Sequence, residues 1–440
     1  MKKVALHNLG CKVNSYETEV MQQKLKENGF LIVPFEQKAD VYIINTCSVT
    51  NMADRKSRQM LHKAKKNNPE SVVVAVGCYV QTREEEEILE DGVDLVIGNN
   101  KKKELISILN HYFDGLKEET VIDINHTNEY EEMKLTDTTE HTRAYIKVQD
   151  GCNQFCSYCI IPYARGRVRS RKREDVLAEV KGLSVKGYSE VVLTGIHLSS
   201  YGIDIEDTLL SLITAIHEIE GIKRIRLGSL EPRIITEEFV QKLIELPKIC
   251  PHFHLSLQSG CNETLKRMNR KYSAEEFLEK VELLRKYFDR PALTTDVIVG
   301  FPGETQEEFE QTVEFLKKVH FYEMHIFKYS KRKGTKAAVM EEQIGEEVKS
   351  ERSNELLELN SQNKSDFEKQ LIGKEMEMLV EERIIISGEN FLTGYTKEYV
   401  KVGFFDKEDH TNKILKGKLD IRKEGDIILF QKNTLNFGME

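Results

Sequence analysis

The sequence predicts an α/β protein in three parts: a parallel sheet covered by helices, a partial barrel of six β/α units, and a small antiparallel β-barrel. Three observations predict this arrangement. The chain has 440 residues, more than one hydrophobic core usually organises. Residues 1–114 and 138–368 alternate Val- and Ile-rich runs with amphipathic stretches, as β/α units do. Residues 371–440 alternate apolar and polar side chains, as the strands of a small barrel do.

The N-terminal part is expected to carry its strands at residues 3–8, 41–45 and 72–76. One helix is expected over residues 15–28, with Asn14 as its N-cap, and a second from about Thr50. Residues 115–140 are polar, acidic and rich in threonine, which predicts a linker to the next part.

The central part is expected to form an open barrel, because six β/α units are too few for a complete eight-stranded one. Its strands are predicted at residues 144–149, 190–194, 224–227, 252–257, 292–299 and 323–329. Chemistry in such a barrel takes place at the carboxyl ends of the strands. A charged helix over residues 344–368 leads to the last part, with strands at 375–381, 391–405 and 427–431.

Composition narrows the class of protein. No window is apolar enough to span a membrane, and the residues after Met1 lack the apolar stretch of a secretory signal, so we expect a cytoplasmic protein. In that reducing compartment, eight cysteines favour metal ligation or catalysis over disulfides. The net charge of −9 argues against a protein that coats nucleic acid, but it permits a local basic site.

Cys152, Cys156 and Cys159 stand at C-x3-C-x2-C spacing, just after the first predicted strand of the barrel. Three thiolates this close can bind three irons of a cubane cluster and leave the fourth iron open to an external ligand. The alternative is a structural zinc site, which would require four closed positions.

The run from Cys152 to Cys159, Cys-Asn-Gln-Phe-Cys-Ser-Tyr-Cys, resembles the radical S-adenosylmethionine (SAM) superfamily. Residues 194–197, 255–260 and 296–304, at the ends of later strands, agree with it. The resemblance implies a 4Fe-4S cluster whose open iron is chelated by SAM. It also implies a SAM site, for which we expect Tyr158, Gly195, Ser256, Gln258, Asp296 and Gly300. The two glycines are expected to let the cofactor approach the backbone.

Cys11, Cys47 and Cys78 each closely follow one of the N-terminal strands. If those strands are parallel, the three thiols emerge at the same carboxyl edge of the sheet, where α/β domains bind ligands. The alternative is three unrelated buried cysteines.

Together the six cysteines resemble the methylthiotransferase family, whose members join a three-cysteine N-terminal domain, a radical SAM core and a C-terminal TRAM domain. The resemblance implies two 4Fe-4S clusters. The one on Cys152, Cys156 and Cys159 would generate a 5′-deoxyadenosyl radical from SAM, and the one on Cys11, Cys47 and Cys78 would hold the sulfur that is transferred. A radical is needed because no side-chain base can remove hydrogen from an unactivated adenine C–H bond.

Residues 9–14, Leu-Gly-Cys-Lys-Val-Asn, resemble the subgroup that acts on N6-threonylcarbamoyladenosine at position 37 of tRNA. That subgroup implies a tRNA anticodon loop, a sulfur source and an electron donor such as flavodoxin or ferredoxin as partners. Three alternatives stay open: an enzyme for isopentenyladenosine, an enzyme for a ribosomal-protein aspartate, and a non-catalytic iron–sulfur protein that binds RNA.

A basic segment follows the cysteine loop and is predicted to contact RNA phosphates through Arg165, Arg167, Arg169, Arg171 and Arg173. The carboxylate of a threonylcarbamoyl group also needs a cation, for which Arg226 and Arg233 are candidates at the end of the third barrel strand. The alternatives are a solvated surface for the segment and a structural ion pair with Glu231 for the last two arginines.

Overall fold

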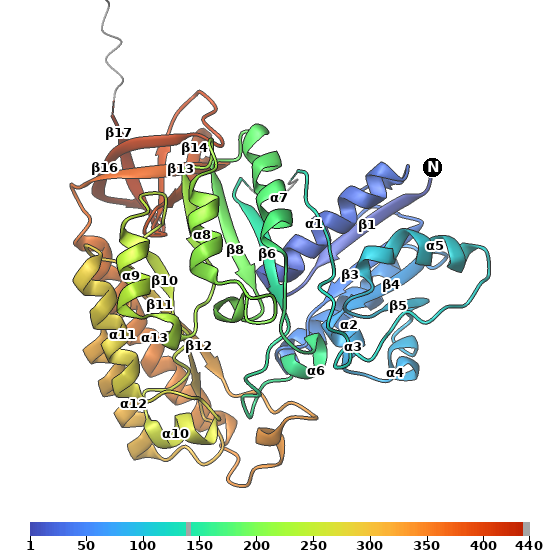
Figure 1. The fold of residues 1–440 in the computed structure, drawn as a ribbon, viewed down its shortest axis with the longest axis horizontal. Coiled ribbons are helices and arrows are strands. Elements are labelled where there is room, and N and C mark those ends of the chain that lie inside the picture. Colours follow the sequence, from blue (N-terminus) through green and yellow to red (C-terminus); the bar gives the residue numbers. More distant parts are fainter. Residues whose placement is uncertain (138–141, 434–440) are drawn as a thin grey trace, which may run out of the picture.

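The computed structural model describes residues 1–137 and 142–433 and arranges them in three sheet-based parts side by side (Figure 1). Within this described range, no helix is long and apolar enough to cross a membrane. The predicted linker lies partly in residues 138–141, outside the described residues.

The N-terminal part is a five-stranded parallel sheet in the order β2-β1-β3-β4-β5. Its strands are β1 (Lys3–Asn8), β2 (Leu31–Ile32), β3 (Val41–Thr46), β4 (Val72–Gly77) and β5 (Leu95–Ile97). The helices are α1 (Lys12–Glu27), α2 (Asn51–Asn67), α3 (Cys78–Gln81), α4 (Glu85–Leu89) and α5 (Leu105–Phe113). Apolar side chains of α1 and α5 cover one face of the sheet and those of α2, α3 and α4 the other, so its strands are apolar on both faces.

The central part contains six parallel strands, as predicted. They are β6 (Ala144–Asp150), β8 (Glu190–Gly195), β9 (Arg224–Leu227), β10 (His252–His254), β11 (Ala292–Val299) and β12 (Glu323–Lys328). Isolated parallel bridges join β9 to the chain around β10, so the two sheets form one open arc. A short strand, β7 (Arg169–Ser170), pairs antiparallel with β6.

The barrel helices surround the arc (Figure 1). They are α6 (Ile161–Arg165), α7 (Arg173–Val185), α8 (Leu209–His217), α9 (Glu237–Ile244), α10 (Asn262–Arg267), α11 (Ala274–Tyr287), α12 (Gln306–Val319) and the long α13 (Glu346–Lys369).

The C-terminal part is a closed barrel. Its strands are β13 (Glu375–Ile386), β14 (Glu389–Thr396), β15 (Lys401–Phe405), β16 (Ile414–Glu424) and β17 (Ile427–Lys432). The single strand predicted over residues 391–405 is wrong, because the chain turns near Tyr399 (φ 68°) and forms two strands. The pairing is not wholly antiparallel, since β15 and β17 run parallel.

Two further predictions are corrected in the N-terminal part. Helix α1 begins at Lys12 and not at Ser15, with Cys11 as its N-cap. Asn14 therefore lies inside the helix, where its amide donates to the carbonyls of Leu9 (2.7 Å) and Thr46 (3.0 Å). The described part of the linker is also ordered by the core, because Met133 and Leu135 are buried against α1 and α5.

Candidate active site

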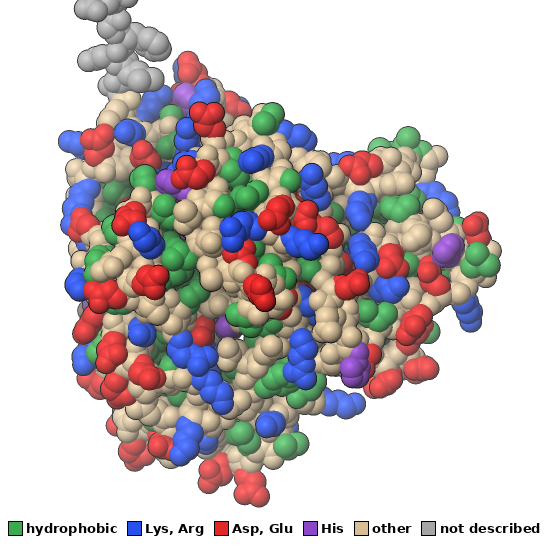
Figure 2. Space-filling model, in the orientation of Figure 1, with side chains coloured by type: hydrophobic (Ala, Val, Ile, Leu, Met, Phe, Trp, Pro, Cys, Tyr) green, Lys and Arg blue, Asp and Glu red, His purple; other side chains and the backbone are tan. Residues whose placement is uncertain are grey.

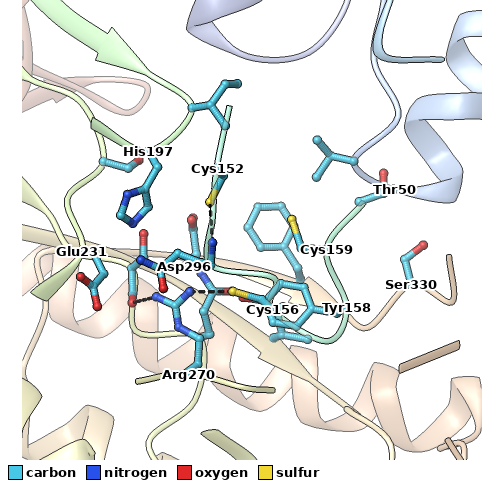
Figure 3. Close-up of a pocket in the computed structure, with 18 of the residues that line it drawn as sticks. Thr50, Cys152, Cys156, Tyr158, Cys159, His197, Glu231, Arg270, Asp296 and Ser330 are labelled. Atoms are coloured by element: carbon cyan, nitrogen blue, oxygen red, sulfur yellow. Dashed lines mark hydrogen bonds between the residues drawn. The ribbon is translucent and has the colours of Figure 1, made fainter. Parts of the chain in front are cut away.

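A cavity of about 310 Å³ opens at the carboxyl ends of the central strands (Figure 3). The loop after β6 contributes the three cysteines, β11 contributes Asp296, and the segments that follow other strands contribute His197, Glu231, Ser256 and Tyr329. Val49 and Thr50, which follow Cys47 in the N-terminal part, also line it. The cavity therefore lies where two parts of the chain meet, at the edge that the barrel prediction assigns to chemistry.

Cys152, Cys156 and Cys159 border this cavity together (Figure 3). Gly151 bends the chain into the loop with φ 73°, and a Cβ atom there would lie 1.8 Å from the carbonyl oxygen of Arg167. Burial raises the pKa of Cys152 to about 11 and of Cys159 to about 12, and the neighbouring Cys156 adds to both shifts. Three mutually repelling thiolates are stable here only beside strong positive charge, so the donor set fits an iron–sulfur cluster.

Arg270 is a site residue that sequence reasoning missed. One of its Nη atoms donates to Sγ of Cys156 (3.2 Å) and the other to the carbonyl of Ser256 (3.1 Å). Its guanidinium also lies over the ring of Tyr272, 4.9 Å from the ring centre. An arginine after a short helix carries no sequence signal, because only the fold brings it to the cysteine loop.

Cys11, Cys47 and Cys78 gather at the carboxyl edge of the N-terminal sheet, as predicted. A Cβ atom on Gly10 would lie 2.8 Å from Sγ of Cys47, so the chain beside Cys11 packs directly onto the Cys47 side chain. Burial, together with the neighbouring charges of Cys78 and Cys11, raises the pKa of Cys47 to about 12. Cys47 and Cys78 are buried, whereas Cys11 is exposed. Three thiols gathered at one edge of the sheet fit a second cluster.

Polar side chains surround this second group of thiols. Nε of Arg165 donates to Sγ of Cys78 (3.3 Å), and the amide of Asn99 donates to the same sulfur (3.7 Å). Arg165 also donates to the side-chain oxygen of Asn14 (2.6 Å). Arg165 belongs to α6, directly after the barrel's cysteine loop, so it connects the two cysteine groups.

A buried charge network supports that connection. Glu17 of α1 pairs with Arg165 (2.6 Å), and with Lys147 and Lys102 (2.7 Å each), while Lys147 also pairs with Asp150 (2.6 Å). All five side chains are nearly or completely buried, and three cations face two carboxylates. The network thus places an excess of buried positive charge next to Cys78, whose Sγ accepts the hydrogen bond from Arg165.

The predicted SAM-site residues divide into two groups. Tyr158, Ser256, Gln258 and Asp296 line the cavity, and Nε2 of His254 lies 3.3 Å from Oδ2 of Asp296. Gly195 and Gly300 do not line it. A Cβ atom at Gly195 would lie 2.8 Å from Gln149, and one at Gly300 would lie 2.3 Å from Lys349. Both glycines therefore pack closely against side chains of the protein itself.

The predicted RNA-contacting arginines also need correction. Arg165, Arg169 and Arg171, predicted to contact phosphates, and Arg226, predicted to bind the threonylcarbamoyl carboxylate, are buried with 0–1% of their surface exposed. They cannot make those contacts in this structure. Arg171 pairs with Glu179 (2.6 Å), and Arg226 pairs with Glu190 (2.7 Å). Arg226 also donates to carbonyls of Lys397 and Thr396 in the C-terminal barrel. These arginines hold the parts of the protein together.

The other three candidates remain accessible. Arg167 is exposed and lies over the ring of Phe155 in the cysteine loop, 4.5 Å from its centre. Arg173 is half-buried and paired with Asp207, and Arg233 is half-exposed and paired with Glu231 (2.8 Å). On the face shown in Figure 2, Lys and Arg are interspersed with Asp and Glu, so a local basic site fits this surface better than a basic face.

The site can be compared with known proteins. Residues 146–316 match the family model described as Radical SAM superfamily, and residues 3–98 match the model described as Uncharacterized protein family UPF0004. Among solved structures, the radical SAM methyltransferase TsrM from Kitasatospora setae superposes with a TM-score of 0.58, at 16% identity, over 77% of each chain. The cobalamin-dependent enzyme OxsB gives 0.51, at 12% identity, over 84% of this chain and 56% of that one. These two share the fold.

Curated relatives are closer and span nearly the whole chain. A Bacillus subtilis protein named threonylcarbamoyladenosine tRNA methylthiotransferase MtaB is 45% identical, over 95% of this chain and 94% of its own. The Aquifex aeolicus protein of that name is 42% identical, over 91% and 98%. The tRNA-2-methylthio-N(6)-dimethylallyladenosine synthase of Carboxydothermus hydrogenoformans is 38% identical, over 93% and 94%. With both cysteine groups assembled and similarity this extensive, the chain belongs to the methylthiotransferase family of radical SAM enzymes.

Proposed function

We propose that the protein is a tRNA methylthiotransferase that converts N6-threonylcarbamoyladenosine at position 37 of tRNA into its 2-methylthio derivative. The observation that carries this function is the pair of three-cysteine groups joined through Arg165, with the loop after Cys47 lining the barrel cavity. The 45% identity to a threonylcarbamoyladenosine enzyme supports the choice of substrate.

Cys152, Cys156 and Cys159 would hold one 4Fe-4S cluster, and Cys11, Cys47 and Cys78 the other. When bound with SAM, the two clusters supply the radical that removes hydrogen from the adenine ring and the sulfur that replaces it. The side chains of the cavity have simpler tasks. Tyr158, Ser256, Gln258 and Asp296 would bind and orient SAM, and the apolar walls would exclude water.

The RNA must enter between the N-terminal part and the barrel, where the cavity opens. Arg167 is exposed next to the cysteine loop and would contact a phosphate of the anticodon loop. The domain division at 1–114, 138–368 and 371–440 belongs to this proposal, with the last part as a TRAM domain. The proposal also includes a cytoplasmic location, a sulfur source, and an electron donor of the flavodoxin or ferredoxin type.

Isopentenyladenosine at position 37 is the second candidate substrate, favoured by the 38% identity to a dimethylallyladenosine enzyme. Reconstituted protein should be incubated anaerobically with SAM, dithionite and either of two anticodon stem-loops, one carrying each modified adenosine. We expect 5′-deoxyadenosine formation and methylthiolation of the threonylcarbamoyl stem-loop, detected by mass spectrometry. If only the isopentenyl stem-loop were modified, the proposed substrate would be wrong and the proposed class of reaction would stand. Absence of 5′-deoxyadenosine would contradict the enzyme assignment itself.

A further inference from the structure

The loop after β12 is strongly basic. Five of the nine residues from Lys328 to Lys336 are Lys or Arg and none is acidic, although the chain has a net charge of −9. Lys331, Lys333 and Lys336 are exposed. Among residues 1–137 and 142–433, no carboxylate forms an ion pair with Lys331 or Lys336. The loop therefore carries positive charge that the described residues leave available to a partner.

A second basic segment meets this loop at the start of α2. The backbone N–H of Asn51 donates to the hydroxyl of Ser330 (3.0 Å), and the side-chain amide of Asn51 donates to the carbonyl of Lys331 (2.9 Å). Arg332 is buried beneath this contact and donates to Asn51 (2.9 Å) and Asp54 (2.8 Å). These hydrogen bonds fix two segments that are far apart in the sequence against each other.

Arg55 and Lys56 extend the positive charge along α2. Both are exposed, and neither pairs with a carboxylate of the residues that the structure describes. Arg55 lies one helical turn after Asn51, so it is on the side of α2 that meets the loop. Residues 51–56 and 328–336 thus form one surface, the basic junction, on which Arg55, Lys56 and Lys331 have no counterion among the described residues.

The basic junction borders the active-site cavity. Thr50 and Ser330 line the side of that cavity away from His197 and Glu231 (Figure 3), and Lys328 lines it as well. When a nucleotide places its base in a cavity, its phosphates must run along the rim. Cations on the rim are therefore well placed to neutralise the phosphates on either side of that nucleotide.

A second cavity, of about 320 Å³, adjoins the junction. Asn51, Arg332 and Lys333 line it, together with Tyr163 of α6. The side chain of Tyr163 is 43% exposed, and its ring meets that of Phe155 at 84°, with the ring centres 5.9 Å apart. An exposed aromatic ring held in place by a neighbouring ring is suited to stacking with a nucleobase.

The charges of this second cavity favour a base over a phosphate. Glu84 and Glu87 line it as well, and Glu87 pairs with Arg83 (3.1 Å) and lies 4.0 Å from Lys333. Two carboxylates beside the cations reduce the attraction for an anion, whereas a neutral base loses nothing by it. The phosphates therefore belong on the junction, and a base belongs in the second cavity.

We propose that the basic junction binds phosphates of single-stranded RNA beside the nucleotide in the active-site cavity, and that the second cavity takes a neighbouring base stacked on Tyr163. This interaction surface rests on the proposed function. An acidic electron-transfer protein is the other kind of partner that a basic surface fits. The exposed ring and the position on the cavity rim favour RNA, because nucleobases stack on aromatic rings.

The test measures binding of an anticodon stem-loop with threonylcarbamoyladenosine to reconstituted full-length enzyme at several salt concentrations. The triple variant Arg55→Gln, Lys56→Gln, Lys331→Gln should bind more weakly. Its log-log dependence of affinity on salt should fall by roughly 2, at roughly 0.7 for each lost contact to a single strand. Tyr163→Ala should weaken binding on the order of 10-fold at every salt concentration without changing the slope, and Tyr163→Phe should bind as wild type.

A matched control removes the same number of charges elsewhere. Lys26, Lys38 and Lys66 are exposed, and each lies at or near the amino edge of the N-terminal sheet, Lys66 in the last turn of α2. Their joint replacement by Gln should keep the wild-type slope. Iron content and thermal unfolding show whether each variant folds with its clusters.

An unchanged slope in the junction variant would overturn the phosphate contacts, and an equal loss in the control variant would show that only net charge matters. Unchanged binding by Tyr163→Ala would overturn the stacked base. If the junction variant bound RNA normally but lost activity with reduced flavodoxin and kept it with dithionite, the partner would be the acidic protein. Wild type that binds no stem-loop is a different result, because it would overturn the proposed function together with this surface.

Discussion

Nε of Arg165 donates a hydrogen bond to Sγ of Cys78 over 3.3 Å. The two residues belong to different parts of the chain, since Cys78 begins α3 in the N-terminal part and Arg165 ends α6 in the barrel. The guanidinium that hydrogen-bonds to a thiol of the N-terminal cysteine group therefore comes from the helix that follows the cysteine loop of the barrel.

Arg165→Met should destabilise the protein, because Glu17 and Asp150 would lose a buried counterion. Lys102 and Lys147 still pair with Glu17, so we expect a loss of about 3 kcal/mol, at the lower end for a broken buried ion pair. Anaerobic thermal unfolding measures it. Arg167→Met, at an exposed position two residues away, is the matched control and should change stability by less than about 0.5 kcal/mol. Equal effects of the two changes would contradict a structural role of the Arg165 network.

The two cysteine groups should behave as separate metal sites. Replacing Cys152, Cys156 and Cys159 by Ala should leave about half the iron and abolish SAM cleavage, because one of two clusters is lost. Replacing Cys11, Cys47 and Cys78 should also halve the iron, but SAM cleavage should continue without sulfur insertion. Iron analysis and 5′-deoxyadenosine assays measure both effects. Full iron content in either triple variant would show that those cysteines are not ligands.

Arg167 should contribute to tRNA binding through a phosphate. Its replacement by Ala should weaken binding and reduce the log-log dependence of affinity on salt by roughly 0.7 to 0.9. SAM cleavage without RNA should stay at the wild-type rate. Binding titrations at several salt concentrations measure the slope, with exposed Lys26→Ala as the control. An unchanged slope would mean that Arg167 is an ordinary solvated side chain.

His252 should make the stability of the protein depend on pH. Burial and the positive charges of Arg226 and Lys12 hold its pKa well below the ordinary value of 6.5. The unfolded chain therefore binds a proton below pH 6.5 that the folded protein does not, and stability falls as the pH drops from about 7 toward the folded pKa. The loss from this one residue should approach 1.4 kcal/mol for each pH unit between about 6.5 and the folded pKa.

Replacing His252 by Gln should flatten this dependence. Unfolding of wild type and variant is compared between about pH 7.5 and 5.5, where the stability difference should move in favour of the variant at the acidic end. A parallel pH dependence of the two proteins would show that His252 is protonated in the folded state.

Local patterns predicted three of the five strands of the N-terminal sheet and the six parallel strands of the central part, but they missed the short strands β2, β5 and β7. Strands such as β3 and β4 are apolar on both faces, so the runs of Val and Ile identify them without knowledge of their neighbours. The same reasoning was less successful near turns. The start of α1 at Lys12 depends on how Gly10 packs against Cys47, a contact between residues far apart in the chain.

The candidate cysteines were also predictable, for a chemical reason. Thiols directly after parallel strands must meet at one sheet edge, and closely spaced thiols in a loop must face one cluster, so order along the chain was sufficient. The functions of the charged residues were not predictable in this way. Arg165 and Arg167 are two residues apart in the same basic segment, yet one is buried between two parts of the protein and the other is exposed.

The sequence by itself therefore determined the reaction class, because cluster ligation depends on residue type, spacing and strand order. Only the tertiary structure decided which cations are structural and which are available to a substrate. The physical reason is that the role of a guanidinium or ammonium group depends on whether a carboxylate pairs with it. The carboxylates that pair with Arg226, Arg165 and Arg143 come from distant segments of the chain.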